Sequence, residues 1–461
     1  MYCKKDKRIV KSIEKNIIFA SENSVYMDIY VEKFGGASVN SAEAILNVEH
    51  ILRMEKRKRV IVISAMGKTT NKLENLVGKW FTEKVFFQSQ FEELKDYHLD
   101  IINKLFENRN EILDKKDNLI NIVEDIFEEM KNKLYITPTT DYNFLYDSIV
   151  SYGERLSTTI ISYYLDVVGL SNKLVYSYTI VKTDNNYRDA NVNWTQTQQE
   201  IEDRVLPLLE EYDLVITQGF VGGTKENLTT TLGREGSDYS AAILAHCLLA
   251  TSMTVWKDVP GLLNADPKRV EKTVKILSMP YTEAVELSYY GASIIHPKTI
   301  KPLENKKIPL HIKSFVQPQE KGTLICDTPS VNPIVPNYIF KDNQLLLSIV
   351  PRDLSFASEK ILSEIFLILS KHKVRVNMMQ NSAISFSVCF DENKNILPAL
   401  LSDLEKEFFV RYNEGLQLVT IRHYTVGSID KVITRRKILI EQKSRITAQY
   451  LLDKDINPSN N

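Results

Sequence analysis

The sequence predicts an α/β protein, in which a mainly parallel β-sheet covered by helices on both faces precedes a ferredoxin-like βαββαβ region. Strands rich in Val and Ile alternate with helical segments from residue 28 to about residue 315, which is typical of a parallel sheet. Glycine-rich turns follow several of these strands. From about Asn343 the order becomes strand, helix, two strands, helix and strand, which is the ferredoxin-like order.

The composition excludes several classes of protein. The formal net charge is -1 over 461 residues, so neither nucleic acid nor an anionic membrane is expected as a partner. No apolar run reaches the roughly 18 residues that a membrane-spanning helix needs. Residues 1–27 are polar and basic, and we expect them to be a disordered extension outside the fold. The four cysteines form no CxxC pair, which favours reduced thiols in a cytoplasmic protein over disulfides or a metal site.

The first two predicted strands each lead into a turn that contains glycine. The strand at residues 28–34 runs into Gly35 and Gly36, and a helix is expected at residues 41–56. The strand at residues 59–63 runs into Gly67-Lys68-Thr69, which looks like the end of a Walker A loop. That loop would need a glycine in place of Val62, inside the strand, so we reject a P-loop.

The next segment is mainly helical. Residues 81–134 predict a plain helical hairpin, because Leu, Ile and Phe recur among charged residues. Another helix is expected to begin near Gly153. Apolar residues flank Glu154 on both sides, which favours a role in binding a cation or an ammonium group over a surface ion pair. A strand is predicted at residues 174–182 and a helix at residues 196–210.

The strongest functional signal is a strand, turn and helix in succession. A buried strand at residues 213–216 leads through a glycine-rich turn to a helix at residues 237–249. The N–H groups and positive dipole at a helix N-terminus favour an anion, and Arg234 adds a planar guanidinium suited to carboxylate or phosphate. Asp238 is expected to cap the helix or to act in the site. An ordinary capped turn would explain Ser237 and Asp238, but not the glycines and the arginine.

The remaining elements complete both predicted regions. Pro260-Gly261 and Asp266-Pro267 force turns after a strand at residues 253–256. Ligands of such sheets bind at the carboxyl ends of the strands, where every glycine-rich motif falls, so we expect one composite site. The other predicted elements are a helix at 281–290, strands at 310–313, 345–350, 374–379, 383–390, 416–423 and 446–451, helices at 358–372 and 396–409, and a partly helical stretch at 428–440.

Five motifs in this order resemble aspartate kinase of the amino-acid kinase family. The resemblance implies the family's carbamate-kinase-like three-layer αβα sandwich over residues 28–325. It also implies a regulatory region at residues 340–461, with one full ACT-like module and a shortened second one. The motifs are Lys33-Phe34-Gly35-Gly36-Ala37-Ser38-Val39, Ser64-Ala65-Met66-Gly67-Lys68-Thr69-Thr70-Asn71, Gly153-Glu154-Arg155-Leu156-Ser157, Thr231-Leu232-Gly233-Arg234-Glu235-Gly236-Ser237-Asp238, and Asp258-Val259-Pro260-Gly261 with Asp266-Pro267.

The resemblance implies transfer of the γ-phosphoryl group of ATP, with Mg²⁺, to the β-carboxylate of L-aspartate. This is the first step towards lysine, threonine, methionine and diaminopimelate. By resemblance, Lys33 stabilises the transferring phosphoryl group, Asp238 organises Lys33, Arg234 holds a substrate carboxylate and Glu154 pairs with the α-ammonium. The implied substrate-binding residues are Thr70, Glu154, Arg234, Glu235, Gly236 and Ser237, and the implied nucleotide-binding residues are Lys33, Gly35, Gly36, Ala37, Lys257, Asp258, Leu263, Lys268 and Ser293.

Some positions depart from the family's pattern. Lys257 replaces a threonine, and Ser293 stands where some members have an ATP-binding lysine, so we hypothesise that Lys257 supplies the missing charge. Residues 376–385, which match the effector segment of lysine-inhibited members, contain no acidic residue. Lysine, threonine or no effector therefore all stay open. A homodimer is implied by the resemblance, since ACT modules usually pair across chains.

Three alternatives compete with this interpretation. Glutamate, acetylglutamate and uridylate kinases share the fold, but Glu154, Arg155 and the ACT-like region argue against them. A fusion to homoserine dehydrogenase is disfavoured by the length and by the lack of a GxGxxG segment. The alternative from another class is a catalytically inactive amino-acid sensor of the ACT type. Against the sensor, Lys33, Glu154, Arg234 and Asp238 are all present.

Overall fold

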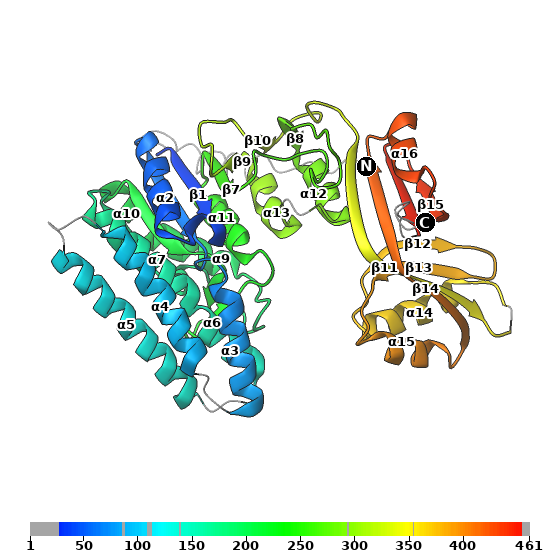
Figure 1. Cartoon of the computed structure of the whole chain (residues 1–461), viewed down its shortest axis with the longest axis horizontal. Coiled ribbons are helices and arrows are strands. Elements are labelled where there is room, and N and C mark those ends of the chain that lie inside the picture. The colour runs from blue at the N-terminus through cyan, green and yellow to red at the C-terminus, as the bar shows by residue number, and fades with distance from the viewer. Residues whose placement is uncertain are drawn as a thin grey trace, which may run out of the picture. The chain divides into compact units, whose positions relative to one another are not determined.

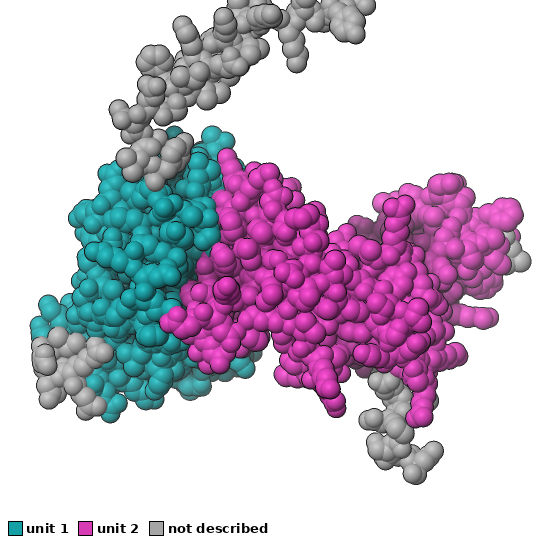
Figure 2. Space-filling view, turned by 90° about the horizontal axis from the view of Figure 1, so that it is seen from above, with its two compact units in different colours: residues 1–231, 244–253 teal, residues 232–243, 254–461 magenta. Residues whose placement is uncertain are grey.

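The computed structural model describes residues 27–84, 88–107, 113–137, 140–292, 295–353 and 355–453 (Figure 1). These residues form two compact units, shown in teal and magenta in Figure 2. Unit 1 comprises the described residues up to Thr231 together with Leu244–Met253, and unit 2 comprises Leu232–Ile243 together with the described residues from Thr254 onward. The predicted domains, residues 28–325 and 340–461, differ from these two units, and that division stays a prediction.

Unit 1 contains the predicted parallel sheet. Its strands are β1 (Ile29–Phe34), β2 (Lys58–Ile63), β3 (Asn172–Val175) and β4 (Leu214–Gln218), and they lie parallel in the order β3-β4-β2-β1. Every residue of β4 is buried. Because successive side chains of a strand point to opposite faces, both faces of the sheet are covered here, as predicted.

Helices surround this sheet, and most of them lie where the sequence predicts. The predicted hairpin is present as α4 and α5. The elements are the 3-10 helix η1 (Gly36–Val39), α2 (Ala42–Met54), α3 (Thr69–Glu83), α4 (Gln88–Leu105), α5 (Leu113–Ile136), α6 (Tyr142–Val150), α7 (Tyr152–Val167), α8 (Ser177–Ile180), α9 (Trp194–Arg204) and α10 (Leu206–Glu211), with the short hairpin strands β5 (Val221–Gly223) and β6 (Thr229–Thr231).

Two predictions for unit 1 were wrong. The strand predicted at residues 174–182 ends at Val175 and is followed by α8. The chain turns there because the backbone N–H of Ser177 donates to Gln218 Oε1 at 2.7 Å and its hydroxyl donates to the carbonyl of Val221. The helix predicted at residues 196–210 is two helices that meet at Val205, because Pro207 lacks an N–H and starts a new helix instead of continuing one.

Helix α11 (Gly236–Cys247) and strand β7 (Ser252–Lys257) contribute residues to both units. Within unit 2 follow β8 (Ser278–Pro280), α12 (Tyr281–Tyr290), α13 (Pro297–Lys306), β9 (Leu310–Ser314) and β10 (Thr323–Cys326). Strand β10 is parallel to β8 and antiparallel to β9, so this part of the fold is mixed.

The predicted ferredoxin-like module is present in unit 2. It consists of β11 (Asn337–Pro351), α14 (Glu359–Lys371), β12 (Val376–Asn381), β13 (Phe386–Asp391), α15 (Leu397–Leu404) and β14 (Phe408–Arg422). These strands belong to a six-stranded antiparallel sheet with the order β12-β13-β11-β14-β16-β15. Alternate residues of β11, such as Leu345 and Leu347, pack with Ile365 and Leu400 of the two helices.

The second module is completed by a strand from earlier in the chain. Its own elements are the end of β14, α16 (Val426–Ile433), β15 (Ile438–Lys443) and β16 (Thr447–Leu452). The first half of β11, from Asn337 to Lys341, pairs with the end of β14, and a register shift separates it from the half that begins at Gln344. One long strand therefore serves both modules, which the sequence analysis did not anticipate.

Candidate functional site

In unit 1 the turns after β1 and β2 interlock. The N–H of Gly67 donates to the carbonyl of Gly36 at 3.0 Å. A Cβ on Gly36 would lie only 2.8 Å from the carbonyl oxygen of Ala65 and 2.9 Å from that of Gly67, so only glycine allows the two turns to approach so closely. Lys33 is the last-but-one residue of β1 and is buried, and its Nζ folds back over Gly35. The turn therefore presents an ammonium group beside glycine backbone.

Glu154 lies in the first turn of α7, close to the same turns. Gly153 lets the helix approach, because a Cβ there would lie 3.0 Å from Ala65 Cβ. Glu154 Oε1 accepts a hydrogen bond from the backbone N–H of Ala65 at 3.3 Å, while Oε2 is buried and has no hydrogen-bond partner among the described residues. Burial raises the pKa of Glu154 to about 8, although the Ala65 N–H and the charge of Lys33 oppose that rise. A buried carboxylate oxygen without a partner suits a cationic ligand.

The other predicted residues of unit 1 are more accessible. Ala37 is exposed at the start of η1, and Thr70 is half-buried in the first turn of α3. The neighbouring Thr69 is buried, and its hydroxyl has no hydrogen-bond partner among the described residues. The structure thus brings Lys33 and Glu154 together around Ala65 and leaves Ala37 and Thr70 open to a ligand.

Asp147, a fully buried residue in α6, was not predicted as a functional residue from the sequence. It accepts hydrogen bonds from the backbone N–H of Thr231 at 2.8 Å, the Thr231 hydroxyl at 2.7 Å and the backbone N–H of Arg188 at 3.0 Å. Burial raises the pKa of Asp147 to about 6. These bonds hold Thr231, the last residue of β6, which lies three residues before Arg234. An acid inside the otherwise apolar helical run at residues 144–150 was the available signal.

In unit 2 the predicted anion-binding turn has an unusual backbone. Gly233 and Glu235 both have positive φ, 78° and 54°, on either side of Arg234. A left-handed conformation is uncommon for a residue other than glycine, so Glu235 needs support from its surroundings. The N–H of Gly236 donates to the carbonyl of Gly233 at 3.0 Å and closes the turn. The Arg234 side chain is exposed as a result.

Asp238 lies in the first turn of α11 and is 4 % exposed. Its Oδ2 is 3.8 Å from Nζ of Lys257, the last residue of β7. Ser237 precedes it and is half-buried. The structure therefore pairs the implied catalytic aspartate with the lysine that departs from the family's pattern.

The predicted nucleotide-binding turn follows β7. Asp258 and Lys268 are exposed, and Leu263 is half-buried. Gly261 has a φ of 129°, and a Cβ there would lie 2.8 Å from Thr323 Oγ1, so the turn needs glycine. The predicted nucleotide residue Ser293 lies outside the described residues.

No group of three or more His, Cys, Asp or Glu side chains that could hold a metal ion occurs in the described residues. No helix among them is long and apolar enough to cross a membrane.

Comparison with known proteins adds independent information. Residues 28–314 match the model of the amino acid kinase family. The chain is 29 % identical over 401 residues to lysine-sensitive aspartokinase 3 of Escherichia coli (strain K12), covering 86 % of this chain and 87 % of the relative. It is 30 % identical over 416 residues to chloroplastic aspartokinase 1 of Arabidopsis thaliana, covering 85 % of this chain and 70 % of the relative.

Solved structures agree with these relatives. E. coli aspartokinase III in complex with lysine and aspartate, in the T-state, matches with a TM-score of 0.75 and 27 % identity, over 92 % of this chain and 96 % of that one. The same enzyme in complex with aspartate and ADP, in the R-state, matches with the same TM-score, identity and coverage.

Proposed function

This chain belongs to the amino acid kinase family and, within it, to the aspartokinases, and from that premise we propose that it phosphorylates the β-carboxylate of L-aspartate with ATP. One observation carries the proposal. Lys33 and Glu154 lie close to each other near Ala65. Lys33 offers a cation for a phosphoryl group, and Glu154 offers a carboxylate for an ammonium group. Gly36 and Gly153 allow this approach, because a Cβ at either position would force neighbouring atoms to shift.

The chemistry requires charge neutralisation, because a carboxylate is a poor nucleophile towards an anionic nucleotide. We assign that task to Lys33 and to the backbone N–H groups of Gly35 and Gly36, with Ala37 beside them. We also assign to the active site the charged pair of Asp238 and Lys257. Mg²⁺ would neutralise charge on the phosphate oxygens.

Substrate recognition is assigned to groups that match the charges of L-aspartate. Glu154 binds the α-ammonium through its unpartnered Oε2, and Arg234 binds a carboxylate with its exposed guanidinium. The other proposed substrate-binding residues are Thr70, Glu235, Gly236 and Ser237, and the other proposed nucleotide-binding residues are Asp258, Leu263, Lys268 and Ser293.

The regulatory proposal concerns the six-stranded sheet. We place the catalytic domain at residues 28–325 and the ACT region at residues 340–461, with lysine as the effector, because the E. coli relative is lysine-sensitive and has been solved with lysine. The segment at residues 376–385 contains β12, which is an edge strand. An unpaired edge invites pairing with another chain, which supports a homodimer.

A direct assay tests the function. The protein is incubated with Mg-ATP and L-aspartate, and the acyl phosphate is trapped as its hydroxamate. L-glutamate and the Lys33→Ala variant serve as controls, each with and without lysine or threonine. Hydroxamate from aspartate alone, lost in the variant, is the expected result. No product from the wild type, together with lysine or threonine binding in calorimetry, would favour the inactive sensor instead.

A further inference from the structure

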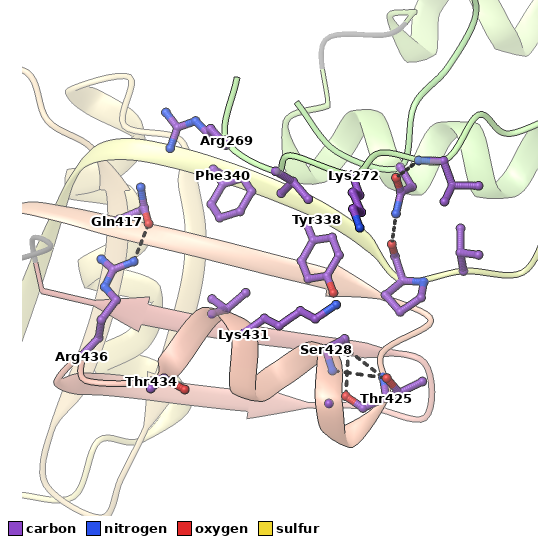
Figure 3. Close-up of a pocket in the computed structure, with 17 residues that line it drawn as sticks. Arg269, Lys272, Tyr338, Phe340, Gln417, Thr425, Ser428, Lys431, Thr434 and Arg436 are labelled. Carbon is purple, nitrogen blue, oxygen red and sulfur yellow. Dashed lines mark hydrogen bonds between the residues drawn. The ribbon is translucent and has the colours of Figure 1, made fainter. Parts of the chain in front are cut away.

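A pocket lies wholly within unit 2, and the residues that line it include none of those assigned above (Figure 3). Its volume is about 880 Å³, within the range of small-molecule sites. Three elements form its walls: the loop at residues 264–274, the start of β11, and α16 with the chain that follows it. The loop continues directly from the proposed nucleotide-binding turn.

The floor of the pocket is aromatic. Tyr338 and Phe340 are two residues apart on β11, so their side chains project from the same face of the strand. The Arg269 guanidinium lies 5.2 Å from the centre of the Phe340 ring. Val432 and Pro336 add apolar surface. Such a floor suits a planar ring.

The walls of the pocket are basic. Four cationic side chains line it, and none of its described lining residues is an aspartate or a glutamate. Arg269 is neutralised by an ion pair with Asp342, and Arg436 donates to Gln417 at 2.6 Å. Lys272 and Lys431 form no ion pair in the described part of the chain. In Figure 3 both lysines extend towards the part of the pocket that holds Tyr338.

We propose that this pocket binds a small anion carrying a planar ring, in the class of phosphorylated aromatic or heteroaromatic metabolites. Lys272 and Lys431 bind the anionic group, and Tyr338 and Phe340 stack against the ring. The first turn of α16 also lines the pocket, and its positive end adds to the attraction. Lys272 and Lys431 are exposed, so an anion can reach both ammonium groups.

The pocket is joined to the nucleotide-binding turn through Asn264. Its side-chain N–H donates to the carbonyl of Pro336 at 2.8 Å, its carbonyl accepts from the N–H of Tyr338 at 2.8 Å, and its Oδ1 accepts from the N–H of Val274 at 2.7 Å. A ligand that contacts Tyr338 and Lys272 therefore acts on the same segment as Asp258 and Lys268. Resting on the proposed function, the inference is that the ligand changes the KM for ATP.

Calorimetry with phenyl phosphate as the probe tests the site without any catalytic step. We expect wild-type protein to bind phenyl phosphate at least tenfold more tightly than inorganic phosphate, and the Lys272→Gln/Lys431→Gln variant to lose at least tenfold in affinity. Lys437→Gln is the matched control, because Lys437 is exposed nearby but does not line the pocket. Lys33→Ala must also retain binding, which separates this pocket from the catalytic anion site. Equal affinity in the double variant and the wild type would overturn the proposal.

The hydroxamate assay tests the coupling. Phenyl phosphate should shift the KM for ATP at least twofold in the wild type and leave the double variant unchanged. An unshifted KM would overturn the coupling. Calorimetry needs no substrate, so a failure of the kinase proposal and a failure of the pocket proposal give different results.

Discussion

The protonation state of Glu154 gives the sharpest test of the catalytic proposal. Its carboxyl is 2 % exposed, and burial raises its pKa to about 8. At pH 7 a group with that pKa is about 90 % protonated, whereas an ordinary glutamate is almost fully ionised. If Glu154 binds the α-ammonium of L-aspartate, it must ionise on binding. About 0.9 proton should therefore be released per bound aspartate at pH 7, and about 0.1 at pH 9.

The pKa of Glu154 also determines how the KM for aspartate should depend on pH. The ionised fraction rises from about 1 % at pH 6 to about 90 % at pH 9, so the KM should fall roughly 90-fold over that interval. Titration of aspartate in two buffers of different ionisation enthalpy measures the proton release, and steady-state kinetics measures the KM. A fall in the KM as the pH rises is informative, because a glutamate with an ordinary pKa would give a KM that does not change between pH 6 and pH 9.

Glu154→Gln is the matching perturbation. The amide oxygen can still accept from the Ala65 N–H, while the charge is lost. Loss of one partner of a buried charge pair costs about 2 kcal/mol or more, so the KM should rise at least ~30-fold and its pH dependence should disappear. Glu129→Gln is the control, because hydrogen bonds from Arg155 hold the pKa of Glu129 below its usual value. Aspartate binding without proton release at pH 7 in the wild type would refute the reasoning.

Three further predictions follow from other contacts. Gly36→Ala places a Cβ 2.8 Å from the carbonyl oxygen of Ala65 and should lower kcat/KM at least ~100-fold in the hydroxamate assay; near wild-type kcat/KM would show that the turn can shift freely. Lys257→Ala should raise the KM for ATP far more than that for aspartate, and an unchanged KM for ATP would remove the hypothesis that Lys257 supplies the charge missing at Ser293. Arg422→Met removes the guanidinium from the buried Glu283, which then keeps, among the described residues, only the contact of its Oε1 with His423 Nε2 at 3.1 Å, and should cost about 3–5 kcal/mol in urea unfolding, with recovery on adding Glu283→Gln; no recovery would contradict the pairing.

Much of the fold was predictable because its signals are local. The strand β2 is a short run rich in Val and Ile, and both β2 and the helix α12 were predicted nearly at their observed bounds. The error at residues 174–182 arose because the pattern is apolar enough for a strand, while Ser177 forms tertiary hydrogen bonds to Gln218 and Val221. Sequence patterns do not report such long-range bonds. The double use of β11 escaped prediction for the same reason, since its partner β14 lies far along the chain.

The candidate site was predictable only in part. Glycine motifs at strand ends indicated where Lys33 and the following turn would lie, because parallel strands end at one edge of a sheet. A binding role for Glu154 was anticipated from its apolar neighbours, but its raised pKa comes from burial in the folded protein, which a sequence pattern does not report. Asp147 was hard to predict, because a single acidic residue in a largely apolar helical segment does not reveal which groups its carboxylate will bind. Only the structure shows that it holds Thr231.

The strand β11 also links the two proposed ligands of unit 2. Its second half pairs with β13, which in turn pairs with β12 in the proposed effector segment. Its first half carries Tyr338 and Phe340, and the N–H of Tyr338 is bonded to Asn264. An effector at β12 would therefore reach β11 through β13, whereas an anion in the pocket would contact β11 directly. Coupling between two bound ligands is reciprocal, so lysine must change the affinity for phenyl phosphate by the same factor by which phenyl phosphate changes the affinity for lysine. A factor of one in both titrations would mean that β11 does not couple the two sites.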